Sequence, residues 1–540
     1  MLYPPTPKAD ILKRAAAGAM CLREPLCWKQ LDWRTTDPPE WTCPQSQSRR
    51  LYEMSYHTGA MAGASTLIEK SLNEVSATGT RHEVFLCSSK HAAYSTANYH
   101  YPFKHCDYTG VNSALNGRWT TLASTSRATT IFNAFKSKAH FRDVDALMFS
   151  FGSAEWEHWM GFNKTLILHL CHRVNQYRCS YAESVNTFIN VRRLASSGPG
   201  GSLPGGPRHI IGADTIYDQE YIRHYTGVRP ILLGTTMVDA LRSTNHATRR
   251  TKSSDRIACY ADYTTEPLSI SSICCGQSGK HNSKDLDRSK SCPSWRRQCQ
   301  GYTANARMGV CVATNADSKP PAADAQPSEI LWNAHIPPPP ELMDGKSKAP
   351  WNAKAFRFVT PTWKGRYETR DLAKYRAVVY IPYSVSNFES VEHRALNVPM
   401  FVPDVKFAVQ FSIDRTETYG PYCSFTDSQH PGAHVDSPYE FSPNVRDGAG
   451  AEFWLGFSEI YQWPCTKIFS SWAHLNELLM TADLVKMRKC NEQANKWMRF
   501  ELVQNWCWAF GEMGPGKRDF PSSYSAATQE LYGTTAIPTA

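Results

Sequence analysis

The sequence predicts an α/β protein of two doubly wound domains that face each other across a cleft, with long disordered insertions. Three observations lead to this fold class. Short apolar runs alternate with short helical patterns in two blocks, and such alternation is typical of parallel sheets covered by helices. A polar stretch without periodicity separates the two blocks. In the second block an apolar strand leads through a turn into a helix, so a helix N-terminus lies at the carboxyl end of a strand.

The first 135 residues form a poorly defined N-terminal region, because their apolar periodicity is weak. Only short helical pieces are expected there, near Thr66–Glu74 and Thr129–Ser137.

Residues 136–240 are predicted to form the N-terminal doubly wound domain. Its predicted strands are Val144–Phe151, Lys164–Cys171, His209–Ala213 and Pro230–Leu233. Its predicted helices are Ala154–Met160, Tyr181–Leu194 and Asp218–Tyr225. Gly227 follows the last helix and suits the left-handed backbone of a helix C-cap. The Gly/Pro-rich segment Ser196–Pro207 predicts a flexible loop.

Residues 241–350 are predicted to be a disordered insert with a Pro-rich linker. Up to about residue 328 the segment is polar, dotted with cysteine and without period, which predicts disorder; a retained intron would have the same character. The run Pro337–Pro340 predicts a stiff linker.

Residues 351–512 are predicted to form the C-terminal domain with terminal helices, followed by a tail over 513–540. Its predicted strands are Ala377–Ile381, Pro399–Val402 and Thr466–Phe469. Helices are expected over Thr369–Tyr375, from Asn387 onward, over Gly448–Tyr461, over Trp472–Met480, and from Ala482 to about Phe510. The last helix carries an apolar stripe that indicates packing on a core.

The charge and composition exclude some classes of partner. The net charge of +10 is spread along the chain. The sequence contains no dense basic run interleaved with aromatics, so nucleic-acid binding is not predicted. No apolar run is long enough to predict a membrane span. The first residues lack the apolar core of a signal peptide. We therefore expect a cytoplasmic protein, or a protein of the Golgi or ER lumen if the natural chain begins further upstream.

The 17 cysteines form no CxxC pair, and no zinc-type spacing occurs. No metal site is therefore predicted, although a few disulfides remain possible in a secretory protein.

Two sets of residues predict a ligand site. Ser384, Ser386 and Asn387 lie where the helix after strand Ala377–Ile381 begins, and they predict helix capping, phosphate contact or both. Glu392 lies one turn further along and can accept hydrogen bonds from sugar or ribose hydroxyls. Alternatively, Glu392 is a solvated residue paired with Arg394 or His393.

In the N-terminal domain, candidate residues follow the strand ends where ligands of open α/β sheets gather. His172 suits a general base and Arg173 suits a diphosphate, unless both are surface residues of a turn. Asp214 follows strand His209–Ala213 and is predicted to be either a helix N-cap or the base that deprotonates an acceptor hydroxyl. Ser150 and Gly152 are candidates for the acceptor side of the cleft.

Two blocks of the chain resemble glycosyltransferases of the GT-B type. The first runs from Phe149 to Leu233 and contains FGSAEWEHWMGFNKTLILHLCHR and RHIIGADTIYDQEYIRHYTGVRPILL. The second runs from Tyr375 to Pro403 and continues less clearly from SPYEFSPNV to QNWCWAF; together the blocks cover about half of the chain. The likeness is to the exostosin-like and glycosyl-transferase-4-like groups, and more closely to exostosin-like proteins of animals and other eukaryotes. It implies two Rossmann-like domains, the N-terminal one on the acceptor side and the C-terminal one binding the donor.

The resemblance carries one departure. Retaining enzymes of this type have a glutamate pair, and the second glutamate precedes a small-apolar-Gly-apolar-Pro run. Glu392 and the run to Pro399 match this pattern, with Asn397 where Gly is common. Ser384 stands where the first glutamate belongs, and Glu389 has a different spacing.

These residues imply a glycosyltransferase that moves a sugar from a nucleotide-sugar to a hydroxyl of a glycan, lipid or protein, without a metal or other cofactor. Glu392, Ser384, Ser386 and Asn387 would hold the donor with help from Arg173, and His172 or Asp214 would act as the base. Two alternatives remain open: a non-catalytic protein that binds a nucleotide-sugar or glycan on the same fold, and a nucleotide-sugar epimerase or hydrolase.

Overall fold

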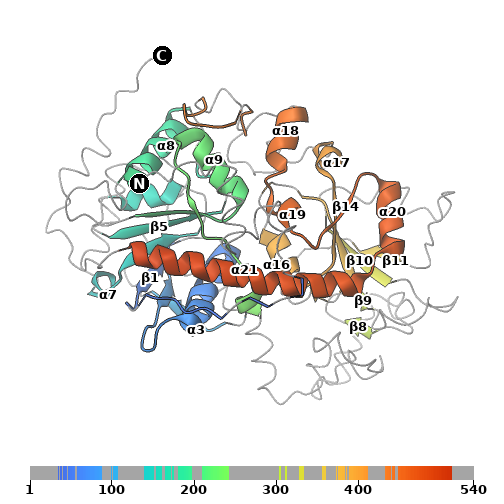
Figure 1. Ribbon diagram of the computed structural model, residues 1–540, viewed down its shortest axis with the longest axis horizontal. Coiled ribbons are helices and arrows are strands. Elements are labelled where there is room, and N and C mark those ends of the chain that lie inside the picture. Colours follow the sequence, from blue (N-terminus) through green and yellow to red (C-terminus); the bar gives the residue numbers. More distant parts are fainter. Residues whose placement is uncertain are drawn as a thin grey trace, which may run out of the picture.

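The computed structural model of the 540-residue chain describes most of residues 34–106, 139–241, 372–410 and 432–513, together with 303–305, 310–312, 328–333 and 356–359. Shorter gaps inside these ranges include residues 172, 384, 386 and 387. The described part contains two parallel sheets covered by helices, which lie side by side in Figure 1. The predicted class of two doubly wound α/β domains is therefore confirmed, while most of the predicted insertion lies outside the described residues.

The first sheet has, within the described residues, seven parallel strands in the order β3-β2-β1-β4-β5-β6-β7. The strands predicted over residues 136–240 are all present, as β4 (Ala146–Phe149), β5 (Thr165–Leu170), β6 (Ile210–Ala213) and β7 (Ile231–Leu232).

The same sheet contains three strands that the sequence did not predict: β1 (Arg50–Glu53), β2 (Glu83–Leu86) and β3 (Lys104–His105). They come from the region described above as poorly defined. Each is short and carries charged residues, so the apolar signal is weak. Their parallel pairing adds residues 50–105 to the first sheet.

Helices cover both faces of the first sheet because successive strand residues point to opposite sides. In β5, Leu166 and Leu168 pack in one core with α8 (Tyr181–Ser196) and α9 (Ile216–Thr226). Ile167 faces the opposite core, which contains η2 (Leu67–Leu72) of the segment that begins with α2 (Thr58–Thr66) and ends with α3 (Asn73–Val75).

Shorter helices complete the domain: α7 (Ala139–Arg142) precedes β4, and the 3₁₀ helix η3 (Ala154–Trp159) follows it. Gly227 has a φ of 70° at the end of α9, which confirms the predicted C-cap.

The second sheet has, among the described residues, five parallel strands in the order β11-β10-β12-β13-β14. Its predicted strands are β12 (Ala377–Tyr380), β13 (Met400–Pro403) and β14 (Lys467–Phe469), and an unpredicted edge strand is β11 (Phe356–Val359). Strand β10 (Ser328–Asn333) lies between β11 and β12, although the sequence assigned these residues to the insert. A single six-residue run after a long polar segment gave too little context to predict a central strand.

Helices of the second domain alternate with these strands. They are α16 (Phe388–Ala395), α17 (Val405–Val409), α18 (Gly448–Leu455), α19 (Glu459–Gln462) and α20 (Trp472–Thr481). Of the helix predicted over Thr369–Tyr375, residues 372–373 are helical, and residues 369–371 and 374 lie outside the described residues. The remaining short pair of strands, β8 (Thr303–Asn305) and β9 (Val310–Val312), is antiparallel.

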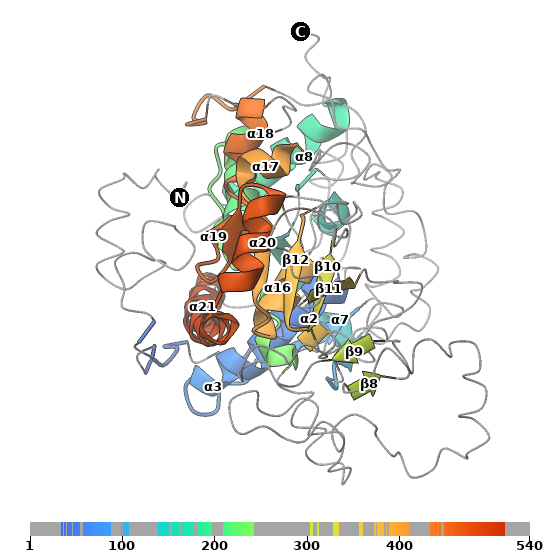
Figure 2. The same cartoon turned by 90° about the vertical axis from the view of Figure 1, so that its right-hand side faces the viewer.

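The long helix α21 (Leu484–Glu512) joins the two domains. Its first turns pack Leu484 and Met487 on the core of the second sheet, and its later turns pack Leu502 and Trp506 on the core of the first sheet. Figure 1 shows α21 running across both domains, and Figure 2 looks along its axis. The packing stripe was predicted correctly, but the sequence did not indicate that its two ends serve different domains.

Two disulfides fasten α21. Cys465–Cys490 ties it to the segment before β14, and Cys43–Cys507 ties it to the segment before β1. A third disulfide, Cys87–Cys106, connects the ends of β2 and β3. Where the structure describes the chain, it contains no helix both long and apolar enough to cross a bilayer.

Candidate functional site

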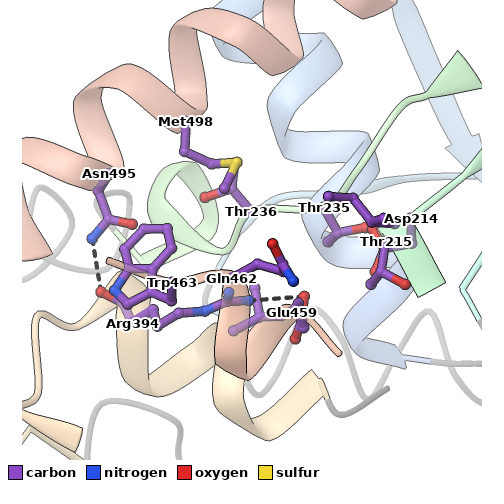
Figure 3. A pocket seen from close by; sticks show the side chains of 12 residues that line it. Asp214, Thr215, Thr235, Thr236, Arg394, Glu459, Gln462, Trp463, Asn495 and Met498 are labelled. Atoms are coloured by element: carbon purple, nitrogen blue, oxygen red, sulfur yellow. Dashed lines mark hydrogen bonds and ion pairs between the residues drawn. The ribbon is translucent and has the colours of Figure 1, made fainter. Parts of the chain in front are cut away.

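A pocket lies between the two domains, and the space inside it, including the part open to solvent, is about 490 Å³. The first domain contributes the residues that follow β6 and β7, the second domain contributes α16 and α19, and α21 closes one side (Figure 3). Its lining comprises Asp214, Thr215, Ile216, Thr235, Thr236, Val391, Arg394, Glu459, Gln462, Trp463, Asn495 and Met498. Carboxylates, amides, hydroxyls, one guanidinium and one indole thus face a common space.

Asp214 is the predicted site residue that the structure brings into this pocket. It follows β6 directly, its backbone N–H donates to the carbonyl of Leu170 at 2.8 Å, and it is 5% exposed. The N-cap of α9 is Thr215, whose side chain accepts from the backbone N–H of Asp218 at 3.1 Å. The alternative that Asp214 caps this helix is therefore wrong. Its carboxylate lies at the carboxyl end of the sheet, where ligands of this fold class bind.

A buried histidine contacts Asp214 from behind. His169 lies in β5 with no exposed surface, and its Nε2 is 3.2 Å from Oδ1 of Asp214. The same Nε2 is 3.4 Å from Oγ1 of Thr235, which also lines the pocket. The ring of Trp506 on α21 lies edge-on to the imidazole of His169, with 5.6 Å between the ring centroids. Sequence reasoning examined the residues beyond this strand and missed His169 inside it.

The second domain contributes a buried arginine that is fixed by an ion pair. Arg394 on α16 is 6% exposed, and its Nη2 forms an ion pair with Oε2 of Glu459 at 3.0 Å. Its guanidinium lies over the ring of Trp463, 4.9 Å from the centroid. Its Nε has no hydrogen-bond partner among the described residues. A guanidinium with an N–H that is not yet paired can donate a further hydrogen bond to an anionic or carbonyl oxygen.

The end of α16 is fixed by α21. Nδ2 of Asn495 donates to the carbonyl of Arg394 at 2.7 Å and to Oδ1 of Asn397 at 2.8 Å. Asn397 has a φ of 60°, the left-handed region that Asn tolerates best after Gly. This geometry explains why the resembling family commonly has Gly at the corresponding position.

Glu392, the central predicted donor residue, is buried but does not line this pocket. It is 4% exposed, and its Oε1 accepts from the hydroxyl of Tyr99 in the first domain at 2.8 Å. The alternative that it is a solvated surface residue is therefore wrong. Arg394, its suggested partner, makes its ion pair with Glu459. Glu392 thus lies at the contact between the domains, on a different side of α16 from the pocket.

Arg173 is likewise buried away from the pocket. Its Nε donates to the hydroxyl of Tyr217 at 3.0 Å, and its Nη2 donates to the carbonyl of Pro443 at 3.4 Å. The guanidinium lies over the Tyr221 ring. The alternative that it is a surface side chain is wrong; it connects β5 to α9 and to a segment of the C-terminal half.

The other predicted site residues divide into two groups. His172, Ser384, Ser386, Asn387 and Gly152 lie outside the described residues. Ser150 is fully buried and donates to Oε2 of Glu53 at 2.7 Å, at the carboxyl ends of β4 and β1. Beside them, burial and the charges of Asp214, Asp218 and Glu53 raise the pKa of the Cys171 thiol. This edge of the first sheet is therefore acidic and holds a protonated thiol.

Within the described residues, no group of three or more His, Cys, Asp or Glu side chains is placed to hold a metal ion. Asp145, in a sequence that imitates a metal-binding DxD motif, accepts from the backbone N–H of Arg50 at 2.8 Å. It lies at the amino end of β4, at the edge of the sheet remote from the pocket.

Comparison with known proteins gives a limited result. No protein-family model matches the chain, and no curated protein matches it significantly. Among solved structures, a glycosyltransferase of kitacinnamycin is similar with 10% identity and a TM-score of 0.34, covering 87% of this chain and 100% of that one. Anabaena Alr3699/HepE, solved with UDP and glucose, is similar with 9% identity and a TM-score of 0.37, covering 86% and 99%. The calicheamicin glycosyltransferase CalG4 has 9% identity and a TM-score of 0.29, covering 87% and 100%. The fold assignment rests on the two parallel sheets themselves.

Proposed function

We propose that this chain is a GT-B glycosyltransferase of the exostosin-like or glycosyl-transferase-4-like groups. It would transfer a sugar from a nucleotide-sugar to a hydroxyl of a glycan, lipid or protein. The observation that carries the proposal is the pocket between two doubly wound domains, with the buried carboxylate of Asp214 on one side and Arg394 on the other. The resemblance of the two sequence blocks supports the same class, although fold alone does not establish activity.

The lining chemistry suits a sugar with a charged leaving group. Carboxylates accept hydrogen bonds from vicinal hydroxyls, and amides both accept from them and donate to them. The indole of Trp463 offers an apolar face. The guanidinium of Arg394, which lines the pocket, can bind a phosphate oxygen through its N–H donors.

The reaction assigns a role to each side of the pocket. As the acceptor oxygen bonds to the anomeric carbon, Asp214 takes the acceptor proton, a role for a general base. The bond from the anomeric carbon to the diphosphate breaks, and the nucleoside diphosphate leaves with the electron pair. Arg394 stabilises the charge that develops on this leaving group, without a metal. Glu392 and Arg173, which the sequence predicted as donor contacts, lie outside the lining of this pocket. Ser384, Ser386 and Asn387 as donor contacts, and His172 as an alternative base, stay predictions because they lie outside the described residues.

A non-catalytic binding protein is the second candidate. Ser384 stands where the resembling retaining enzymes have their first glutamate. Arg394 is also neutralised by Glu459 in the pocket. Both observations favour binding without turnover.

The three disulfides found within the described residues favour an oxidising compartment such as the ER or Golgi lumen, because such bonds are rare in cytosolic proteins. Expression of the chain with and without a secretory leader, followed by thiol counting under denaturing conditions, tests this assignment.

The purified protein should be mixed with a panel of nucleotide-sugars while nucleoside diphosphate release is followed. Release that depends on an added acceptor supports transfer, and release without acceptor indicates hydrolysis. Binding measured by calorimetry without any release indicates the non-catalytic protein. Absence of both binding and release across the panel would refute the proposal.

A further inference from the structure

His169 and Asp214 form a buried pair that touches the pocket on one side only. Asp214 lines the pocket, whereas His169 is enclosed between the sheet and α21. His169 is the last but one residue of β5 and pairs with Gly212 of β6, two residues before Asp214, so the two side chains lie near each other at the carboxyl ends of adjacent strands. A histidine within an otherwise apolar strand needs a polar partner, since burial of an unpaired imidazole is costly.

The contacts determine which nitrogen of His169 carries the proton. Nε2 faces two acceptors, Oδ1 of Asp214 at 3.2 Å and Oγ1 of Thr235 at 3.4 Å. Nδ1 has no hydrogen-bond partner among the described residues. A proton on Nδ1 would leave a buried donor unpaired and direct a lone pair at a carboxylate. The neutral ring with its proton on Nε2 avoids both penalties.

We propose that His169 is a positioning residue for Asp214: its Nε2–H holds one carboxylate oxygen and orients the carboxylate toward the acceptor hydroxyl in the pocket. This inference rests on the proposed function, because the orientation matters only if Asp214 takes a proton from an acceptor. In this arrangement the carboxylate of Asp214 contacts the ligand, and the imidazole of His169 contacts the carboxylate on the side away from the pocket.

Two surrounding elements keep the pair rigid. Trp506 on α21 packs edge-on against the imidazole and prevents the ring from swinging toward solvent. The turn after β6 is held by the hydrogen bond from the Asp214 N–H to Leu170 and by the Thr215 cap of α9. Such support confines a carboxylate to one orientation, and a small displacement of a catalytic group can cost about 10²-fold in rate.

The charged group in contact with His169 is the carboxylate of Asp214, which follows β6. Glu53 at the end of β1 and Asp218 in the first turn of α9 act, together with Asp214, on the neighbouring thiol of Cys171. Trp506 supplies the neutral contact from α21.

Two variants test the proposal with opposite expectations. His169→Gln keeps an N–H donor near the place of Nε2, and His169→Leu keeps the bulk without the donor. If acceptor-dependent release is observed for the unmodified protein, His169→Leu should lower kcat by about 10²-fold with little change in the donor KM. His169→Gln should retain most of the activity. His209→Gln is the matched control, because His209 precedes β6 at the far edge of the sheet and accepts from the Leu166 N–H. Full activity in His169→Leu would overturn the proposal.

A measurement without turnover separates this inference from the proposed function. In protein labelled with ¹⁵N-histidine, the His169 signals are assigned by their loss in His169→Gln. The proposal expects a neutral ring with the proton on Nε2 and a shift of that signal in Asp214→Asn. A proton on Nδ1, or an Nε2 signal that ignores Asp214→Asn, would refute the pairing whether or not the protein transfers sugar. The expected spectrum together with no release from any donor would refute only the proposed function.

Discussion

The two sides of the pocket are built differently. On the first-domain side, Asp214 is fixed at a strand end, with His169 behind it and Thr215 capping the next helix. On the second-domain side, Arg394 lies on the short helix α16 and is paired with Glu459 of the still shorter α19. A strand end in a packed sheet has one arrangement, whereas an ion pair between short helices can exchange a partner. In the proposed function, the rigid side would take the proton and the adaptable side would bind the ligand.

Asp214→Asn gives the largest expected effect, because the amide cannot take a proton from the acceptor. Turnover should fall by about 10²–10⁴-fold, the range for loss of a general base, while donor affinity changes little. Acceptor-dependent release of nucleoside diphosphate and calorimetric donor binding measure the two quantities.

Asp145→Asn is the control for this variant. It removes a carboxylate of similar burial from the opposite edge of the same sheet, where Asp145 accepts from the Arg50 N–H. We expect it to lower stability without removing activity. If Asp214→Asn transfers sugar at the unmodified rate, Asp214 is not the group that takes the proton from the acceptor hydroxyl.

Acidification should weaken the first domain more than the second, because three described histidines of the first domain and one of the second have lowered pKa values. Burial lowers the pKa of His82, His209 and His224 to about 4, and burial lowers the pKa of His393 on α16 to about 3. Unfolded histidines bind protons near pH 6.5, so between the two values the unfolded chain holds more protons. The free energy of unfolding should therefore fall as the pH is lowered from about 6.5 toward 4.

Hydrogen exchange followed by mass spectrometry at pH 6.5 and 4.5, corrected for the intrinsic rates, resolves this loss by domain. Peptides around β2 and β6 should lose more protection than those around α16. Equal protection of all regions at both pH values would contradict the assigned burial of these histidines.

Arg394→Gln should weaken donor binding with a smaller effect on turnover at saturation. A charge-assisted hydrogen bond contributes about 1.5–3 kcal/mol, so an affinity loss of roughly 10–100-fold is expected. Arg223→Gln is the matched control, because Arg223 forms a comparable ion pair with Glu220 on α9, outside the pocket lining. A donor affinity unchanged in Arg394→Gln would remove this residue from donor binding.

Tyr99→Phe gives the smallest expected effect on donor affinity. Together with Glu392→Ala it decides the role of Glu392. The variant removes the hydroxyl that donates to Glu392 at 2.8 Å, and such a bond to a carboxylate contributes about 1.5–3 kcal/mol at most. If Glu392 only joins the domains, stability falls and donor affinity stays the same. If Glu392 binds the donor as predicted, Glu392→Ala weakens donor affinity by about 1–3 kcal/mol, which calorimetry detects.

The sequence predicted those parts of the fold whose signal is local. Strands β4 to β7 and β12 to β13 are apolar runs bounded by polar residues, and α21 has a long apolar stripe. Strands β1 to β3 and β10 are short and lie beside polar segments, so their existence depends on pairing with distant strands.

The same distinction applies to the candidate site. Asp214 could be predicted, because it directly follows a recognisable strand. Arg394 could not, because its partner Glu459 is far away in the sequence and its position in the pocket depends on both domains. His169 left one signal that could have been used: it is a histidine inside the apolar run LILHLC, which requires a buried polar partner.

The two disulfides on α21 have a consequence for how ligands enter. Each domain is covalently fastened to its own stretch of this one helix, and the pocket residues Asn495 and Met498 lie between the two fastening points. The domains therefore cannot slide past each other or come apart while α21 stays helical. A change in the width of the pocket would therefore take the form of a hinge rotation about this helix, and reducing agents should widen the range of that rotation.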